Sequence, residues 1–168
     1  MLTDEFTIQI ATSNDLDMIL EWRNHPKTRI VMFNSKIITQ QEHAQWFANI
    51  DELNPVIIVA NKDEPIGVVH FKNFKKDSTT HWGFYKKPYS PKGTGSHIAN
   101  AALHYAFNSV EVSKVVGEVL TTNLVSIHFH KKIGFRLEGI MHKSTSNTDF
   151  MLDAYVFGLS TNDWNAIS

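Results

Sequence analysis

The first part of the chain alternates apolar and polar positions and then changes to a helical spacing. Residues 6–11 alternate and are rich in β-forming side chains, which predicts a strand. Residues 12–15 are all good N-caps and precede a predicted helix over residues 16–24. Its apolar side chains form one stripe: Leu16, Ile19 and Leu20. The helix should end at His25-Pro26, because a residue before proline avoids the helical conformation.

A capping box predicts the start of a second helix. Thr39 and Glu42 have the spacing at which each side chain caps the other residue's backbone at a helix start. The face expected to pack has residues three and four positions apart: His43, Trp46, Phe47 and Ile50. An apolar strand over residues 55–60, a turn over 61–65 and a strand over 66–71 then predict a hairpin.

The second half of the chain alternates strands with helices. Further strands are predicted at residues 80–86, 115–120, 135–141 and 150–159. A turn over residues 88–95 precedes a helix whose apolar face is Ile98, Ala102, Leu103, Ala106 and Val110. A last helix starts at the N-cap Asn123 and ends at Gly134, with Lys131 and Lys132 in its final turn. These elements predict an α/β fold with seven strands and about four helices.

Length and composition narrow the class of protein. The 168 residues suit one domain spanning 1–168, and a net charge of -1 gives no field that would attract nucleic acid or an anionic membrane. The absence of cysteine excludes disulfides, zinc thiolates and thiol nucleophiles. No apolar run reaches the roughly 20 residues of a membrane span, and the short acidic start is not typical of a signal peptide. The expected location is the cytoplasm.

The turn before the third helix has the chemistry of a phosphate cradle. Gly93-Thr94-Gly95 joins a strand to a helix, and glycines there allow a ligand to approach the backbone closely. The helix N-terminus behind them offers unpaired N–H groups and partial positive charge. Lys92 adds a full charge. The turn lacks the Lys-Ser/Thr end of an ATP-binding loop and the glycine fingerprint of dinucleotide folds, which argues against ATP and NAD.

Two motifs together resemble the GCN5-related N-acetyltransferases. Residues 90–95 are similar to the pyrophosphate loop of that family, which favours Arg or Gln where Ser90 stands. About 30 residues later the spacing of a second family motif recurs, with a histidine where the family usually has Tyr: Asn123, Ser126, His130, Gly134 and Phe135. The resemblance covers essentially the whole chain. It implies a mixed, splayed seven-stranded sheet that binds acetyl-CoA as cosubstrate, without a metal.

The resemblance also implies which residues hold the cofactor. Backbone groups of the fourth strand would bind the pantetheine: Phe84, Tyr85 and Lys86. The turn and first helical residues would hold the pyrophosphate: Lys92, Gly93, Thr94, Gly95 and Ser96. Asn123 would contact the pantetheine arm.

The N-terminal half resembles one branch of this family, the acetyltransferases of pseudaminic acid biosynthesis. The residues that carry this likeness are Trp22-Arg23-Asn24-His25-Pro26, Met32, Ile38, Glu42-His43 and Trp46. The resemblance implies that the acceptor is the 4-amino group of UDP-4-amino-4,6-dideoxy-N-acetyl-β-L-altrosamine. Arg23, His25 and Arg29 could then meet the diphosphate, since Arg suits phosphate oxygens. Met32, Phe33 and Trp46 would wall the pocket, although residue type and spacing favour packing of Trp46 in the core over stacking on a base.

Acetyl transfer to an amine needs a base and a proton donor for the departing thiolate. His81 stands where the related enzymes often place Glu, which makes it the candidate base, with a plain strand histidine as the equal alternative. His130 stands where the family's Tyr protonates the thiolate, and an imidazolium could do this. Alternative functions are acetylation of a protein N-terminus or a polyamine, and a non-catalytic acyl-CoA-binding regulator. A homodimer is left open.

Overall fold

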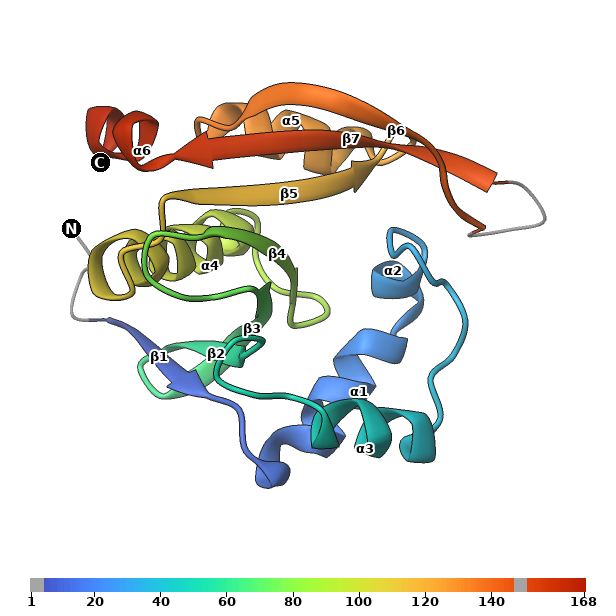
Figure 1. Cartoon of the computed structure of the whole chain (residues 1–168). Coiled ribbons are helices and arrows are strands. Elements are labelled where there is room, and N and C mark those ends of the chain that lie inside the picture. The colour runs from blue at the N-terminus through green and yellow to red at the C-terminus, as the bar shows by residue number, and fades with distance from the viewer. Residues whose placement is uncertain (1–4, 147–150) are drawn as a thin grey trace.

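The computed structural model describes residues 5–146 and 151–168. Within them, seven strands form one mixed sheet in the order β1-β2-β3-β4-β5-β7-β6 (Figure 1). The strands are β1 (Phe6–Ile10), β2 (Val56–Asn61), β3 (Glu64–Lys72), β4 (Thr79–Lys86), β5 (Lys114–Leu120), β6 (Arg136–Ser146) and β7 (Met151–Ser160). Neighbouring strands are antiparallel except β4 and β5, which are parallel. Every predicted strand is present, although the first residue predicted for the last strand, 150, lies outside the described residues.

The described residues contain six α-helices, two more than the sequence predicted. They are α1 (Leu16–Asn24), α2 (Pro26–Arg29), α3 (Gln40–Ala48), α4 (Thr94–His104), α5 (Leu124–Lys132) and α6 (Thr161–Ile167). A 3₁₀ turn, Ser13–Asp15, precedes α1, and a π-helical turn, Tyr105–Ser109, extends α4. The unpredicted α2 starts at the proline that ends α1, because a first-turn residue needs no N–H donor.

The two faces of the sheet carry separate apolar cores. On one face, α4 and α5 pack with α6 against side chains such as Val69, Phe71 and Phe157. On the other face, α1 inserts Ile19 and Trp22 against alternate residues of the same strands. Figure 1 shows α1, α2 and α3 grouped together on this second side. The continuously apolar strand β2 therefore serves two helical layers, because its successive side chains point to opposite faces of the sheet.

The second helix predicted from the sequence, which is α3 in the structure, needs one correction. Of the four residues predicted to pack in α3, His43 is buried, and Phe47 and Ile50 pack against the core around α1. Trp46 does not, because 39% of its surface is exposed and it stacks on the ring of His43 with centroids 5.0 Å apart. Spacing of three and four residues marked the correct side of the helix but could not show where the covering layer ends.

The sheet opens between β4 and β5, as the family resemblance implied. These strands pair only from Thr79↔Lys114 to Trp82↔Gly117, and no pairs follow within the described residues. Beyond Trp82, β4 stays paired with β3, while β5 stays paired with β7. The carboxyl halves of β4 and β5 therefore diverge and leave a gap between two separately bonded parts of the sheet (Figure 1).

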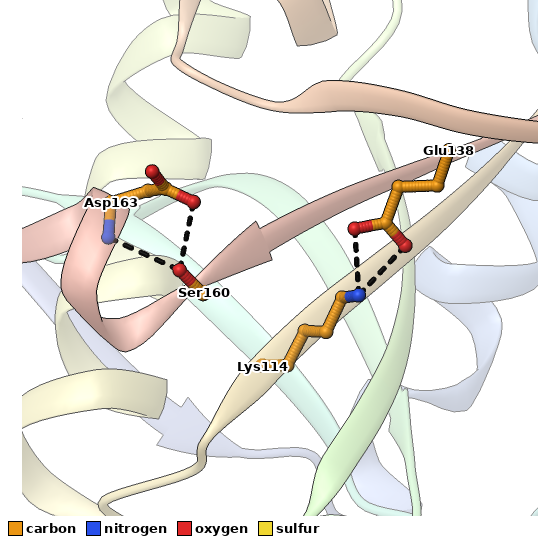
Figure 2. Close-up of polar contacts among 4 residues, drawn as sticks. All are labelled: Lys114, Glu138, Ser160 and Asp163. Atoms are coloured by element: carbon orange, nitrogen blue, oxygen red, sulfur yellow. Dashed lines mark hydrogen bonds and ion pairs between the residues drawn. The ribbon is translucent and has the colours of Figure 1, made fainter.

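Polar contacts hold the far part of the sheet together at the start of β5. Glu138 of β6 reaches across β7 to Lys114 of β5, with Nζ to carboxylate oxygen distances of 2.6 and 2.7 Å (Figure 2). Gly158 allows this crossing, because a Cβ there would lie 2.3 Å from a Glu138 oxygen. At the end of β7, Ser160 caps α6 and exchanges hydrogen bonds with Asp163 (Figure 2).

Candidate active site

The glycine turn has the geometry of an anion cradle. Gly93 has a φ of 96°, a conformation that side chains rarely adopt, and it is the N-cap of the 11-residue helix α4. Within the described residues, the backbone N–H groups of Gly93 and Gly95 have no hydrogen-bond acceptor. A Cβ on Gly93 would meet nothing within 4 Å, so its surroundings are open. These residues fit a pyrophosphate, which needs free N–H groups and close approach.

The second part of the predicted cofactor site is the edge of β4 in the gap. Phe84, Tyr85 and Lys86 pair with β3 on one side, and in the described residues they have no strand partner on the side of β5. Their free backbone groups can bind an amide-containing chain such as pantetheine as an added strand would. The side chain of Tyr85 points away into the core around α1, where its hydroxyl lies 3.4 Å from the Ile19 oxygen.

Helix α5 borders the other side of the gap. Asn123 caps it by accepting a hydrogen bond from the Ser126 N–H at 3.1 Å, and Gly134, with a φ of 97°, follows its end. The side-chain oxygen of Asn123 is therefore already used in capping α5. Its predicted contact to the pantetheine arm would come in addition to this role. Phe129 of α5 touches Phe84 of β4, with ring centroids 5.6 Å apart. The helix is therefore in contact with the strand that carries the free edge.

His130 is the best-defined polar side chain at the gap. It is 5% exposed, stacks on Phe157 and meets Trp82 and Phe135 edge-on. Its Nδ1 lies 2.8 Å from the Ser126 carbonyl oxygen, which can only accept, so Nδ1 carries the proton. Burial lowers the pKa of His130, partly offset by this hydrogen bond. The resting ring is therefore neutral, with a lone pair on Nε2.

His81, the predicted base, lies at the point where β4 and β5 separate. Its side chain is 49% exposed, and its Nδ1 is 3.6 Å from Glu118 Oε1. Glu118 belongs to β5 just beyond the last residue paired with β4. The sequence reasoning did not select Glu118, because the two residues are far apart in the chain. Parallel pairing of neighbouring strands was the only signal that could have suggested the contact.

The Trp22 to Pro26 motif builds a loop beside the site. Trp22 is buried in the core, while Asn24 holds both backbone groups of Ile38 at 2.8 Å. Arg23 Nη2 donates to the Asn34 oxygen at 2.6 Å. Arg29 donates to the backbone oxygens of Asn24 and Ser35, both at 3.0 Å. The motif thus has a structural role in fixing residues 30–38, and both guanidinium groups are already engaged.

The remaining predicted acceptor residues lie around this loop. Met32 packs against the core of α1, Phe33 is partly buried, and Trp46 lies half-exposed on α3. His25 caps α2 by accepting from the Lys27 N–H at 3.3 Å. The His25 ring also meets the edge of Tyr89, with centroids 5.1 Å apart, in the loop before the glycine turn. Tyr89 therefore joins the predicted cofactor loop to the predicted acceptor wall.

His70 of β3 is a partly buried polar group close to Arg23, one of the residues predicted to bind the acceptor. It lies opposite Gly83 in the sheet and its ring packs beside Tyr85, with centroids 5.8 Å apart. Burial, with smaller contributions from the charges of Lys72 and Arg23, lowers the pKa of His70 to about 4. Its Nδ1 and the Nη1 of Arg23 are buried without a hydrogen-bond partner in the described part of the chain. His70 is therefore neutral at pH 7.

The gap is distinct from two hollows on the surface. One, of about 620 Å³, lies beside Lys76 and Glu111, and the other, of about 470 Å³, lies between Phe6 and the outer side of the glycine turn at Thr94. Among residues 5–146 and 151–168, no group of three or more His, Asp or Glu side chains could hold a metal ion. No helix in the same ranges is long and apolar enough to cross a bilayer.

Comparison with known proteins identifies the family. The model of the acetyltransferase (GNAT) domain matches residues 6–136. A spermidine N-acetyltransferase from Vibrio cholerae, solved with CoA and spermine, superposes with a TM-score of 0.86 over 97% of this chain and 99% of that chain, at 17% identity. The structure of AAC(6')-Ib with ribostamycin and coenzyme A gives a TM-score of 0.81 over 96% and 97%, at 20% identity.

Two further relatives have a higher sequence identity to this chain than these two solved structures have. The acetyltransferase PseH of Campylobacter jejuni (strain 81-176) is 28% identical over 127 residues, which are 74% of this chain and 79% of PseH. The uncharacterized N-acetyltransferase YnaD of Bacillus subtilis is 29% identical over 131 residues, 74% of this chain and 76% of YnaD. The chain belongs to the GNAT family and is an acetyl-CoA-dependent N-acetyltransferase.

Proposed function

We propose that this enzyme acetylates the 4-amino group of a UDP-linked 4-amino-4,6-dideoxy-N-acetyl sugar, as in pseudaminic acid biosynthesis. The observation that carries this proposal is the match to PseH from two strains of C. jejuni, each 28% identical over 127 residues. The matched family region also includes the α1–α2 segment, whose Trp22 to Pro26 motif supports the same acceptor. We further propose that the chain forms one catalytic domain, residues 1–168.

The acceptor would bind between the loop of residues 30–38 and the gap in the sheet. Met32 and Phe33 supply apolar surface suited to a deoxy sugar's methyl group. The diphosphate would meet His25 and the guanidinium groups of Arg23 and Arg29. Since both guanidinium groups also hold loop carbonyls, their positions are set before the acceptor arrives. The half-exposed ring of Trp46 is available for stacking.

The chemistry follows from the two histidines at the gap. A sugar amine must lose one proton before it attacks, and His81, with Glu118 beside it, would take that proton. The amine nitrogen then bonds to the acetyl carbon, and the carbon–sulfur bond breaks with its electron pair on sulfur. The nitrogen's second proton ends on sulfur, and His130 would carry it. The products are the acetamido sugar and CoA, so no further reactant is needed.

A panel of acceptors tests the proposal directly. The UDP-amino sugar, spermidine, an aminoglycoside and N-terminal peptides are each incubated with acetyl-CoA, and CoA release is measured. We expect the sugar nucleotide to have the highest kcat/KM. Turnover of spermidine or a peptide without turnover of the sugar would replace this proposal by the corresponding alternative. Binding of acetyl-CoA with no turnover of any amine would favour the non-catalytic regulator.

A further inference from the structure

Two ring nitrogens from opposite sides of the gap converge on Gly117. Trp82 of β4 pairs with Gly117 of β5 in the last register position before the strands separate. A Cβ built on Gly117 would lie 2.8 Å from Trp82 Nε1 and 2.8 Å from His130 Nε2. The missing side chain therefore leaves both nitrogens facing one small space at the mouth of the gap.

The two nitrogens have complementary hydrogen-bonding character. Trp82 is 7% exposed, and its Nε1–H is buried without an acceptor in the part of the chain that the structure describes. An indole N–H can only donate. His130 Nδ1–H is engaged by the Ser126 oxygen, so its Nε2 accepts in the neutral ring. The space above Gly117 therefore has one donor and one acceptor aimed at it.

We propose that Trp82 is a positioning residue for acetyl transfer, which together with His130 holds one small hydroxyl or thiol group above Gly117. That group accepts a hydrogen bond from Trp82 Nε1–H and donates one to His130 Nε2. It is a water molecule or the thiol of the cofactor, which share this chemistry. The proposal deepens the acetyl transfer and rests on the role proposed for His130.

The arrangement gives the departing sulfur a proton route. After His81 has taken the first proton of the amine, the second proton of the attacking nitrogen reaches His130 Nε2. It passes from there to sulfur when the carbon–sulfur bond breaks. If the held group is water, it gives one proton to sulfur and receives one from Nε2. If the group is the sulfur itself, Nε2 gives its proton directly and Trp82 Nε1–H stabilises the thiolate. Both routes leave the proton count unchanged.

A simpler role for Trp82 is packing alone. Its ring stacks on Phe135, with centroids 5.4 Å apart and planes 7° from parallel, which any flat ring could do. The substitution Trp82→Phe keeps a flat ring and removes the N–H, so it separates the two roles. A matched control is Trp164→Phe, because Trp164 is also buried in this core but donates to Asn108 at 3.1 Å, away from the gap.

The kinetic test is a double-mutant cycle with acetyl-CoA and the best acceptor of the panel. Trp82→Phe should lower kcat roughly tenfold, with KM for acetyl-CoA changed less than about twofold. This loss is smaller than the ~10² to 10⁴-fold contribution of a general acid or base, because His130 itself remains in place. Trp164→Phe should retain wild-type kcat. Adding Trp82→Phe to His130→Phe should cause no further loss, since both act on one proton route. Unchanged kcat in Trp82→Phe, or independent losses that multiply, would overturn the proposal.

Indole N–H resonances of protein labelled with nitrogen-15 at tryptophan identify the held group. A Trp82 resonance that shifts with CoA but not with desulfo-CoA assigns the thiol. A resonance already protected from exchange without CoA, and less protected in Gly117→Ala, assigns water. A resonance that responds to none of these changes contradicts the site. Failure of the panel or of His130→Phe would instead count against the proposed function, so the two failures are distinguishable.

Discussion

At the scale of single residues, the buried state of His130 changes its expected part in the reaction. The sequence predicted an imidazolium that donates a proton to the thiolate. Burial lowers the pKa of His130, and the Ser126 carbonyl holds the proton on Nδ1, so the resting ring presents a lone pair instead. His130 must therefore receive a proton before it gives one, which suits a residue that returns the nitrogen's proton to sulfur.

Replacing His130 by Phe keeps a ring of similar size in the stack on Phe157 and removes the proton site. Loss of a general acid or base typically slows a reaction by ~10² to 10⁴-fold, so kcat should fall while acetyl-CoA affinity is retained. Steady-state kinetics and calorimetry measure the two quantities. His130→Tyr, which restores the usual residue of the family, should keep part of the activity. A His130→Phe enzyme within about threefold of wild type would leave the residue structural.

His70 makes the stability of the fold depend on pH. Its folded pKa of about 4 lies below the ordinary 6.5, so the unfolded chain binds the proton more tightly. The stability that the fold gains from keeping His70 neutral is fully present above pH 6.5, and it is lost as the pH falls toward 4. In this window the group changes the free energy of unfolding by about 1.4 kcal/mol per pH unit.

Denaturant unfolding of wild type and His70→Phe across this window isolates that contribution. The variant should lose stability less steeply on acidification, because its residue 70 takes up no proton. His43 and His130 also have pKa values lowered by burial, but they remain in both proteins and cancel in the comparison. Parallel stability curves for the two proteins would show that His70 does not titrate differently in the folded state.

The residues hardest to predict were those whose contacts are with residues far away in the sequence. His81 and His130 were selected from the sequence because each stands at a known position of a sequence motif. Glu118 and Trp82 were not, since the ion-pair distance of 3.6 Å to His81 and the shared approach to Gly117 arise only when β4 and β5 lie side by side. Arg23 and Arg29 were predicted for their charge, while their backbone contacts in the loop could not be read from residue type.

At the scale of elements, local sequence signals located nearly every helix and strand. The capping box at Thr39 and Glu42 is present with both reciprocal hydrogen bonds, and α5 begins after Asn123 as predicted. The short helices α2 and α6 were missed. A proline was taken only as a stop signal for α1, and seven residues at the end of the chain gave too little periodicity for α6.

The glycine turn and α4 act as one element for cofactor binding. A Cβ built on Gly95 would lie 3.9 Å from the ring carbon Cε2 of Phe129 in α5. A side chain at this position would therefore project into the side of the turn that faces the gap. Gly95→Val should therefore weaken acetyl-CoA binding strongly, because it blocks close approach of a phosphate to the free N–H groups. Calorimetry measures the affinity, and circular dichroism checks that the fold is retained. Unchanged affinity would disprove the cradle.

At the scale of the whole molecule, the sheet consists of two parts joined by a short seam. Strands β1 to β4 form one part and β5 to β7 the other, and four register pairs connect them. The helices α4 and α5 pack across the seam on one face and belong to one continuous apolar core. The family resemblance predicted the splay, because the two motifs border it. The seam ends at Trp82↔Gly117, although β5 stays paired with β7 along its whole length.

Acetyl-CoA should bind both parts and so stabilise the whole fold. A ligand that binds only the folded protein raises its stability by about 2.7 kcal/mol at a hundred times its Kd. We expect a higher Tm with acetyl-CoA and slower amide exchange at residues 83–86 and 118–120, which border the gap. Gly95→Val should show neither change at the same concentration. Slower exchange confined to the glycine turn, with no change along β4 and β5, would place the cofactor outside the gap even if it binds.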